Sequence, residues 1–515
     1  MNICLMNFKF FFLVTLFLLS FSSKADEINP TDSINFCQLF PDKSINKSFK
    51  VPKLKITLDK EKKFYRNLMA AKVHGERFID LINNAPLDAQ FKKWFNGKLS
   101  FQGQDDRVCE FKIKLRLTGD YLDHLSINTN DGFSFSALIK PRNKSIESLS
   151  EFKLFIPKSR NNEIEIFGNT MANMLGILSP ETFSTSVEIL NRSHRYLIQE
   201  NITHNFLEAN MINDSPLLEG DERLKMLGFE EDKAGSENTL QSVKIENIGL
   251  PYDIRYSLGR IKNSKWSIAN NSNLKISIDA LNQLNQAYIE FLERTKQIQS
   301  VSKNRLDFRI LSSNEKENIL VWQEYEAFID TLSKGHALIP TNQQFYYDPS
   351  SKSLFPILYD ANFYFPRKWT EVTVPETIRN DSIIGAKSLL IKVNEINPLL
   401  LWSNIKDRNA SYSQEEVEVA LENIMHNLNV LLNRNINRTE QAKIVDNLVF
   451  FGNYPNEYNS NKRLVYSIGV DMFLVCLPLK IDCQPINLKE NEIEDLISGR
   501  LKVEDNYLIY IDSWD

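Results

Sequence analysis

The sequence predicts an α+β fold in which strands dominate the first part of the chain and helices the middle. Segment 109–117 (CEFKIKLRL) alternates apolar and charged residues along its whole length, which is typical of a strand with one buried face. Segment 274–298 instead repeats its apolar residues at helical spacing. The chain is 42% hydrophobic and 11% aromatic, which is typical of a protein that packs a core.

The remaining elements follow from the same local patterns, taken in chain order. Alternation and turn residues predict strands at 51–58, 109–117, 133–140 (the antiparallel neighbour of 109–117), 152–156, 185–190, 195–199, 344–347 and 354–359. Apolar spacing predicts helices at 60–83, 165–178, 274–298 and 318–333, and a further helix that begins with the capping box Ser413-Gln414-Glu415-Glu416. Segment 210–265 is charged, shows no clear period and is interpreted as an insertion or a mobile segment, and the end of the chain again favours strands.

The start of the chain has the three parts of a secretory signal peptide. Lys9 precedes an apolar segment, 10–19, that only Thr15 interrupts, and Ser23 and Ala25 stand at the two positions that a signal peptidase reads. An uncleaved membrane anchor is the alternative, but a spanning helix needs about 20 apolar residues. We therefore expect an exported chain that is not transmembrane after cleavage and is periplasmic, secreted or surface-associated.

The charge of the chain excludes one class of partner. The net charge is −5, and removal of Lys9 and Lys24 with the signal would take it to −7. A mildly acidic chain without a strongly basic block is a poor nucleic-acid binder. The sequence therefore predicts no nucleic-acid partner.

Four cysteines remain after cleavage of a signal that contains Cys4: Cys37, Cys109, Cys476 and Cys483. In an oxidising compartment they allow two disulfides, and the sequence leaves all three pairings open. Cys476 and Cys483 are close enough to bracket a turn, so this pair is the first expectation. Four buried thiols are the alternative, and the wide spacing argues against zinc.

Three stretches of the chain are informative together, by their order and spacing. The first is KIKLRLTGDYLDH at 112–124, followed by Phe-Ser-Phe at 133–135. The second is PKSRN at 157–161, followed by a helix, a hairpin and Gln199-Glu200. The third runs from GHAL at 335–338 through Asn342 and Phe-Tyr-Tyr at 345–347 to PILYDAN at 356–362. Together these stretches resemble the atypical protein kinases typified by spore coat protein H (CotH).

The resemblance, which covers about residues 51–365, and the patterns described above together predict four parts along the chain. These are a signal peptide (1–25), an N-terminal arm (26–50), an atypical protein-kinase-like two-lobed domain (51–365) and a mixed helical and strand C-terminal region (366–515).

By this resemblance the chain is an exported enzyme that transfers a phosphoryl group from a nucleotide, ATP, to an envelope or secreted protein with the aid of Mg²⁺ or Mn²⁺. Phosphoryl transfer needs hard oxygen ligands for the metal and a carboxylate that orients the acceptor. The resemblance implies Asp360 as the main metal ligand and a catalytic residue, with Asn342 as second ligand and Asn362 assisting. Asp330 is the nearest carboxylate upstream for the role of catalytic base. An Asp that closes a turn and an Asn that caps one are the structural alternatives.

The resemblance also implies residues that bind the nucleotide. Lys140, Lys158 and Arg160 are the candidates for phosphate contact, and Glu200 is the candidate partner that fixes a lysine. The structural alternatives are a solvated strand end for Lys140 and an exposed turn for the PKSRN segment.

The chain departs from the family pattern at the site. Ser136 and Ala137 stand where an arginine or lysine is expected on the strand that begins at Phe133. Asn362 replaces the second acidic residue of the metal pair, and no acidic residue stands just before Asn342, where the catalytic base is expected. These departures motivate an alternative function, namely a catalytically inactive kinase-like binding or scaffold protein of the cell envelope.

Overall fold

The structure is a computed structural model of the chain. It describes residues 37, 39–40, 49–76, 87–103, 106–119, 121–128, 132–142, 150–220, 254–297, 305–333, 335–370, 374, 378–433, 463–467, 472–476, 483–487, 501–504 and 507–510. The predicted signal peptide lies outside the described residues, as does most of the predicted arm.

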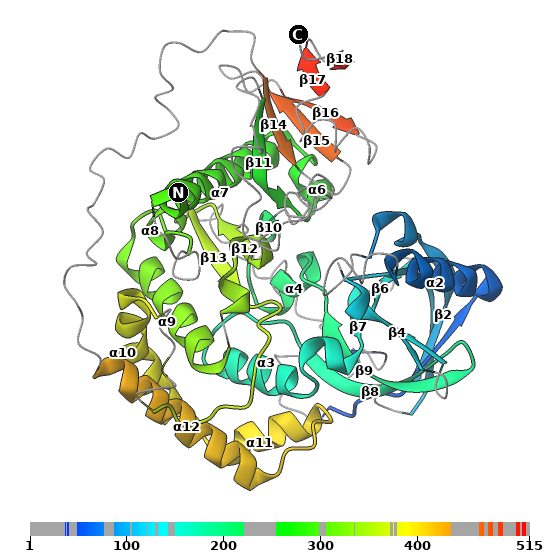
Figure 1. Cartoon of the computed structure of the whole chain (residues 1–515), viewed down its shortest axis with the longest axis horizontal. Coiled ribbons are helices and arrows are strands. Elements are labelled where there is room, and N and C mark those ends of the chain that lie inside the picture. Colours follow the sequence, from blue (N-terminus) through cyan, green and yellow to red (C-terminus); the bar gives the residue numbers. More distant parts are fainter. Residues whose placement is uncertain are drawn as a thin grey trace, which may run out of the picture.

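The first unit is a closed barrel, seen at the right of Figure 1. Its strands follow the order β1 (Leu54–Leu58), β2 (Phe95–Gln102), β3 (Val108–Leu117), β6 (Ala137–Pro141), β7 (Phe152–Phe155), β9 (Arg192–Glu200) and β8 (Thr182–Ile189). Neighbouring strands pair antiparallel except β1 and β8, whose parallel pairing of Leu54 with Val187 closes the barrel. In β3 the apolar residues face inward and the charged ones outward, as the alternation predicts.

Smaller elements accompany the barrel. Helix α2 (Glu61–Glu76) buries Phe64 and Leu68, and the Phe64 ring packs edge-to-face against Phe95 of β2 and Phe135 of β5. Strands β4 (Leu125–Asn128) and β5 (Gly132–Phe135) form a hairpin of their own between β3 and β6. The predicted strand 133–140 is therefore two strands, of which β6 is the antiparallel neighbour of β3.

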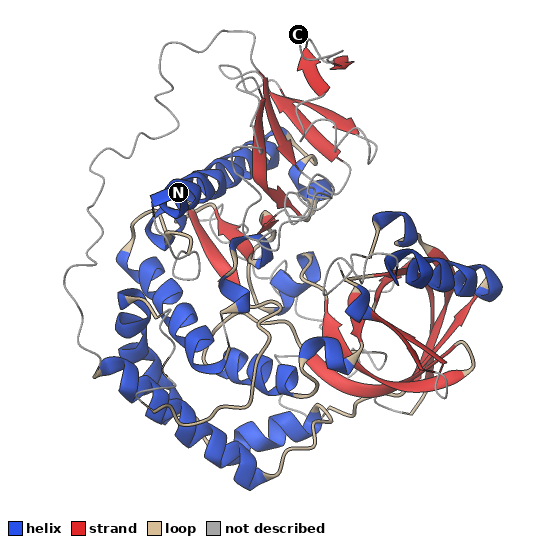
Figure 2. Cartoon of the chain, viewed as in Figure 1, coloured by secondary structure: helices blue, strands red, loops and turns tan. Residues whose placement is uncertain are grey.

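The second unit combines a sheet with most of the helices (Figure 2). The sheet order is β13 (Ser353–Ile357), β12 (Gln344–Asp348), β10 (Leu217–Gly220), β11 (Ile254–Ile261), β14 (Arg463–Ser467), β15 (Met472–Cys476) and β16 (Cys483–Asn487). The helices are α3 (Ile164–Met174), α4 (His204–Ala209), α6 (Ser264–Ser267), α7 (Asn271–Gln297), α8 (Phe308–Leu311), α9 (Lys316–Leu332), α10 (Asn380–Asn394), α11 (Pro398–Asp407) and α12 (Gln414–Leu432). Strands β17 (Leu501–Glu504) and β18 (Tyr507–Tyr510) pair only with each other among the described strands.

The structure confirms several local predictions. The hairpin of β8 and β9, the hairpin of β12 and β13 and the helices α3, α7 and α9 lie where the sequence patterns place them. The capping box is complete. The Ser413 hydroxyl accepts a hydrogen bond from the Glu416 backbone amide, and the Glu416 carboxylate accepts one from the Ser413 backbone amide. The segment interpreted as an insertion is in part sheet, since β10 and β11 are its two described ends.

The helices after Pro366 share a core with the middle of the chain. Buried Leu389 of α10 and Leu428 of α12 belong to the same hydrophobic cluster as Phe328 of α9. Strands β14 to β16 likewise extend the sheet that contains β12 and β13. The predicted boundary between 365 and 366 therefore falls inside a single core.

This core predicts a large loss of stability in Leu428→Ala. Leu428 is fully buried in the shared cluster, so truncation should lower the free energy of unfolding by about 2–5 kcal/mol, as measured by urea unfolding. Val419 lies on the same helix with 44% of its surface exposed, so Val419→Ala is the matched control and should cost under about 0.5 kcal/mol. Equal losses in the two variants would contradict the packing of α12.

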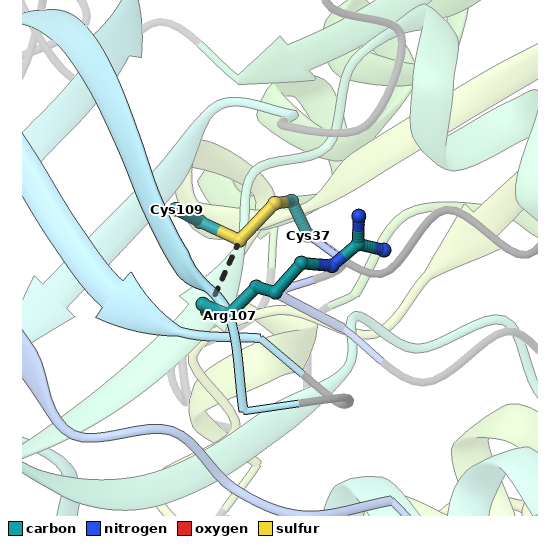
Figure 3. Close-up of a disulfide and its surroundings, with 3 residues drawn as sticks. All are labelled: Cys37, Arg107 and Cys109. Atoms are coloured by element: carbon teal, nitrogen blue, oxygen red, sulfur yellow. Dashed lines mark hydrogen bonds between the residues drawn. A yellow bond between two sulfur atoms is a disulfide. The ribbon is translucent and has the colours of Figure 1, made fainter.

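A disulfide fastens the described part of the arm to the barrel (Figure 3). Cys37 bonds Cys109 of β3, and the Cys109 sulfur lies 3.9 Å from the Arg107 carbonyl oxygen. The ring of Phe40 packs edge-to-face on Phe183. This bond leaves only one of the three pairings open for a second disulfide, the predicted Cys476–Cys483 pair, whose Cα atoms are partners across β15 and β16.

Candidate functional site

Two cations from the barrel side meet at one tyrosine of the second unit. Lys153 of β7 donates a hydrogen bond of 2.8 Å from Nζ to the Tyr359 hydroxyl, and Arg160 donates one of 3.3 Å from Nη2 to the same oxygen. The Arg160 guanidinium also lies 4.3 Å from the centre of the Phe155 ring, within cation–π range. We call Lys153, Arg160, Tyr359 and Asp360 the Tyr359 cluster.

Local backbone geometry places Arg160 and Asp360 opposite each other. Arg160 ends the 3₁₀ turn η3 (Pro157–Arg160), which Asn161 terminates in the left-handed conformation. The Asn161 side-chain amide donates a hydrogen bond of 2.5 Å to the Asn362 side-chain oxygen and one of 2.9 Å to the Phe363 carbonyl oxygen. These bonds connect the turn after β7 to the segment after β13. Asp360 and Asn362 also have positive φ, a conformation in which Asp and Asn are enriched.

The Asp360 carboxylate faces nitrogen atoms on both sides. Its Oδ1 is paired with Arg160 Nη1, and its Oδ2 lies 3.7 Å from His336 Nε2. The backbone carbonyl oxygen of Asp360 accepts a 3.3 Å hydrogen bond from the side-chain nitrogen of buried Asn342, which also donates to the His336 carbonyl oxygen at 3.4 Å. Asn342 is thus brought beside Asp360, as the resemblance implies, but its contact is with the backbone.

A second charged cluster lies at the neighbouring strands. Glu219 of β10 accepts a 2.7 Å hydrogen bond from Arg260 Nε of β11, and its other oxygen lies 3.7 Å from Lys262 Nζ. Lys262 also donates 2.7 Å to the side-chain oxygen of Gln344 on β12. We call these four residues the Glu219 cluster.

The Glu219 cluster is electrostatically coupled to Lys153. Burial alone would raise the pKa of Glu219, but Arg260 and Lys262 together hold it below its usual value, and Lys153 lowers it further. Burial lowers the pKa of Lys262 to about 8, and the charges of Lys153 and Arg260 act in the same direction. The two clusters therefore act as one region with four cations and two carboxylates, Glu219 and Asp360.

A further acid, Glu165 of α3, interacts with Arg160. Burial raises the pKa of Glu165 on α3, and this outweighs the opposite effects of Arg160 and of the 3.1 Å hydrogen bond from Gln199. Among the described residues, the Glu165 Oε2 atom is buried and has no hydrogen-bond partner. Burial therefore favours the neutral form of Glu165 more than it would be favoured in a solvent-exposed glutamate.

The structure distributes the predicted nucleotide-binding residues unevenly. Of the four predicted residues, only Arg160 lies in the Tyr359 cluster. Lys140 forms an exposed ion pair with Glu151, Lys158 is exposed on its turn, and buried Glu200 accepts a 3.4 Å hydrogen bond from the Glu181 backbone amide.

Asp330 has a structural environment that the catalytic-base prediction did not include. Its two carboxylate oxygens accept hydrogen bonds of 2.7 and 3.1 Å from Arg305, and the Ser382 hydroxyl donates at 2.6 Å to one of them. Asp330 and Arg305 are both buried. These contacts tie α9 to the start of α10.

Sequence reasoning missed Lys153, Tyr359, Glu219 and Lys262. The signal for Lys153 was available, because it is the one charged residue in the short apolar strand FKLF of β7. No local pattern marks Glu219 or Lys262, which meet only because β10 and β11 pair across a long connection.

The predicted metal ligands do not fit a Mg²⁺ or Mn²⁺ site in this arrangement. The Asp360 carboxylate is paired with a guanidinium, the Asn342 amide nitrogen is bonded to backbone oxygens, and the Asn362 oxygen accepts from Asn161. Within the described part of the chain, no three His, Cys, Asp or Glu side chains are grouped so that they could hold a metal ion. Mg²⁺ requires near-octahedral oxygen coordination, which these side chains do not offer together.

Comparisons with known proteins leave the resemblance at the level of motifs. No protein-family model matches the chain, and no curated protein matches it. Among the described residues, no helix has both the length and the apolar character needed to cross a membrane.

Lys262 predicts a pH dependence of stability. Its pKa is about 8 in the folded chain and 10.5 when unperturbed, so between these pH values the unfolded chain binds more protons. The free energy of unfolding then rises with pH, and wild type should gain about 2–3 kcal/mol over Lys262→Met between about pH 7 and pH 10. The groups that face Lys262, namely Glu219, Arg260 and Lys153, are unchanged in that comparison. Lys140→Met, at an exposed lysine, should give a curve parallel to wild type, and a parallel curve for Lys262→Met would contradict the burial of its charge.

Proposed function

We propose that the chain binds the phosphate groups of a nucleotide, ATP or a relative, at the Tyr359 and Glu219 clusters. The observation that carries this proposal is the meeting of Lys153, Arg160, Arg260 and Lys262 around the two carboxylates of these clusters, Asp360 and Glu219. Clustered Arg and Lys side chains form charge-assisted hydrogen bonds with phosphate oxygens, and these are stronger than neutral ones. The CotH resemblance supports a nucleotide as the phosphate-bearing ligand.

The origin of the cluster residues supports a ligand that contacts both units. Lys153 and Arg160 come from β7 of the barrel and the turn that follows it, whereas Tyr359 and Asp360 follow β13 of the second unit. A bound anion would add contacts from each unit to one molecule. This arrangement agrees with the two-lobed kinase-like organisation that the resemblance implies, which stays a prediction.

Of the two functions that the sequence suggests, the geometry favours a kinase-like binding protein of the envelope. The Arg160 guanidinium forms an ion pair with the carboxylate of Asp360, the residue expected to hold the metal. The Arg305 guanidinium forms an ion pair with the carboxylate of Asp330, the residue expected to act as base. Phosphoryl transfer to an envelope or secreted protein is the second candidate. It is favoured by the position of Asp360, directly after β13 and next to the two phosphate-binding candidates of the barrel side.

Export of the mature chain is part of the proposal. The Cys37–Cys109 disulfide supports it, because disulfides persist mainly in oxidising compartments. Native protein whose first residue is Asp26 would agree with cleavage of the predicted signal.

Thermal unfolding with ATP tests the proposed function. At a concentration about 100 times the dissociation constant, ATP should add about 2.7 kcal/mol to the free energy of unfolding and raise the melting temperature. Incubation with labelled ATP and an envelope extract separates the two functions. Stabilisation without label transfer supports the binding protein, and label transfer supports the kinase. The absence of both stabilisation and label transfer would contradict the proposal.

A further inference from the structure

We infer that the Tyr359 cluster binds the phosphate groups without a divalent metal, and that Arg160 supplies the positive charge that a metal ion would otherwise provide. This inference rests on the proposed nucleotide binding and names the way in which that site neutralises the ligand.

The first argument for metal-free binding is the position of the Arg160 guanidinium. Arg160 is 4% exposed and is held on three sides, by the Asp360 carboxylate, by the Tyr359 hydroxyl and by the Phe155 ring. An arginine remains protonated at all physiological pH values. A permanent cation therefore stands against the only carboxylate of the predicted metal-ligand set.

The two remaining predicted ligands carry the second step. The Asn342 amide donates its hydrogens to the backbone oxygens of Asp360 and His336, and the Asn362 oxygen accepts the Asn161 amide. A divalent ion bound to Asp360 would have to displace Arg160 or lie beside it. Like charges at such short range repel, and the repulsion is strong where water is excluded.

The hydrogen-bonding capacity of the cations carries the third step. In the described part of the chain, the buried Arg160 Nε has no hydrogen-bond partner, although a buried donor is normally paired. Lys153 Nζ makes one hydrogen bond, to Tyr359, and an ammonium group has three hydrogens to donate. Phosphate oxygens are acceptors that match these unused donors.

Calorimetric titration of the mature chain with ATP, in EDTA and in Mg²⁺, tests the inference. Metal-free ATP carries more negative charge than its magnesium complex, so the affinity in EDTA should equal or exceed that in Mg²⁺. Binding only in Mg²⁺ would overturn the inference and leave the proposed function standing. An absence of binding in both solutions would overturn both.

The variant Asp360→Asn should change the ATP affinity in opposite directions for metal-free binding and for binding through a metal ion. If Arg160 contacts the phosphates, removal of the competing negative charge should tighten ATP binding in EDTA by about three- to tenfold, while the asparagine oxygen still accepts from the guanidinium. If Asp360 holds a metal, the same change should abolish binding in Mg²⁺. Glu188→Gln, in an exposed ion pair with Lys55, is the charge-matched control and should leave both affinities unchanged. Should Asp360→Asn fail to fold, the two wild-type titrations still decide the question.

Discussion

Asp330→Ala should unfold at much lower denaturant than wild type, with a loss of about 3–5 kcal/mol in the free energy of unfolding. The reason is that Arg305 would stay buried without its bidentate partner. Burial alone would lower the pKa of Arg305, yet Asp330 and Glu326 together raise it above its ordinary value, which shows how strongly these carboxylates stabilise the charge. Urea unfolding followed by circular dichroism measures the loss.

The same variant separates a structural Asp330 from a catalytic one. A catalytic base can be removed with little change in stability, whereas the removal of one member of a buried ion pair destabilises the fold. Glu188→Gln breaks the exposed pair with Lys55 and should cost under about 1 kcal/mol, as surface ion pairs do. Full stability of Asp330→Ala, together with loss of an ATP-dependent activity, would restore the catalytic assignment.

Removal of the Cys37–Cys109 disulfide should lower the free energy of unfolding by about 4 kcal/mol. The two cysteines are 72 residues apart in sequence, and the chain-entropy model assigns about this value to a loop of that length. The double variant Cys37→Ala, Cys109→Ala isolates the effect, and urea unfolding measures it.

Single variants provide the control for this second prediction. Since either change breaks the same bond, Cys37→Ala and Cys109→Ala should each cost nearly as much as the double variant. Costs that simply add would mean that the two sulfurs act as separate buried groups, which is the thiol alternative that the sequence left open.

Local patterns were sufficient for most of the secondary structure and insufficient for the site. The alternation of β3 and the capping box at Ser413 are each contained in a few consecutive residues, so each could be predicted without the rest of the chain. The parallel pairing of β1 with β8, which closes the barrel, joins segments with no shared local signal.

The site shows the same limit more sharply. Lys153 and Tyr359 are 206 residues apart in sequence, and Arg160 meets Tyr359 across 199 residues. The motif resemblance pointed to Arg160, Asn342 and Asp360, which the fold brings together. It could not indicate that Arg160 and Asp360 pair with each other, because that pairing depends on how the turn after β7 packs against the segment after β13.

The most direct test of the central claim compares the ATP affinities of Lys153→Met and Lys140→Met. Lys153 belongs to the cluster, whereas Lys140 forms an exposed ion pair with Glu151. The loss of one charge-assisted contact should weaken ATP binding about tenfold or more in Lys153→Met, and Lys140→Met should stay within about twofold of wild type. Undiminished affinity in Lys153→Met, or a larger loss in Lys140→Met, would contradict binding at the Tyr359 cluster.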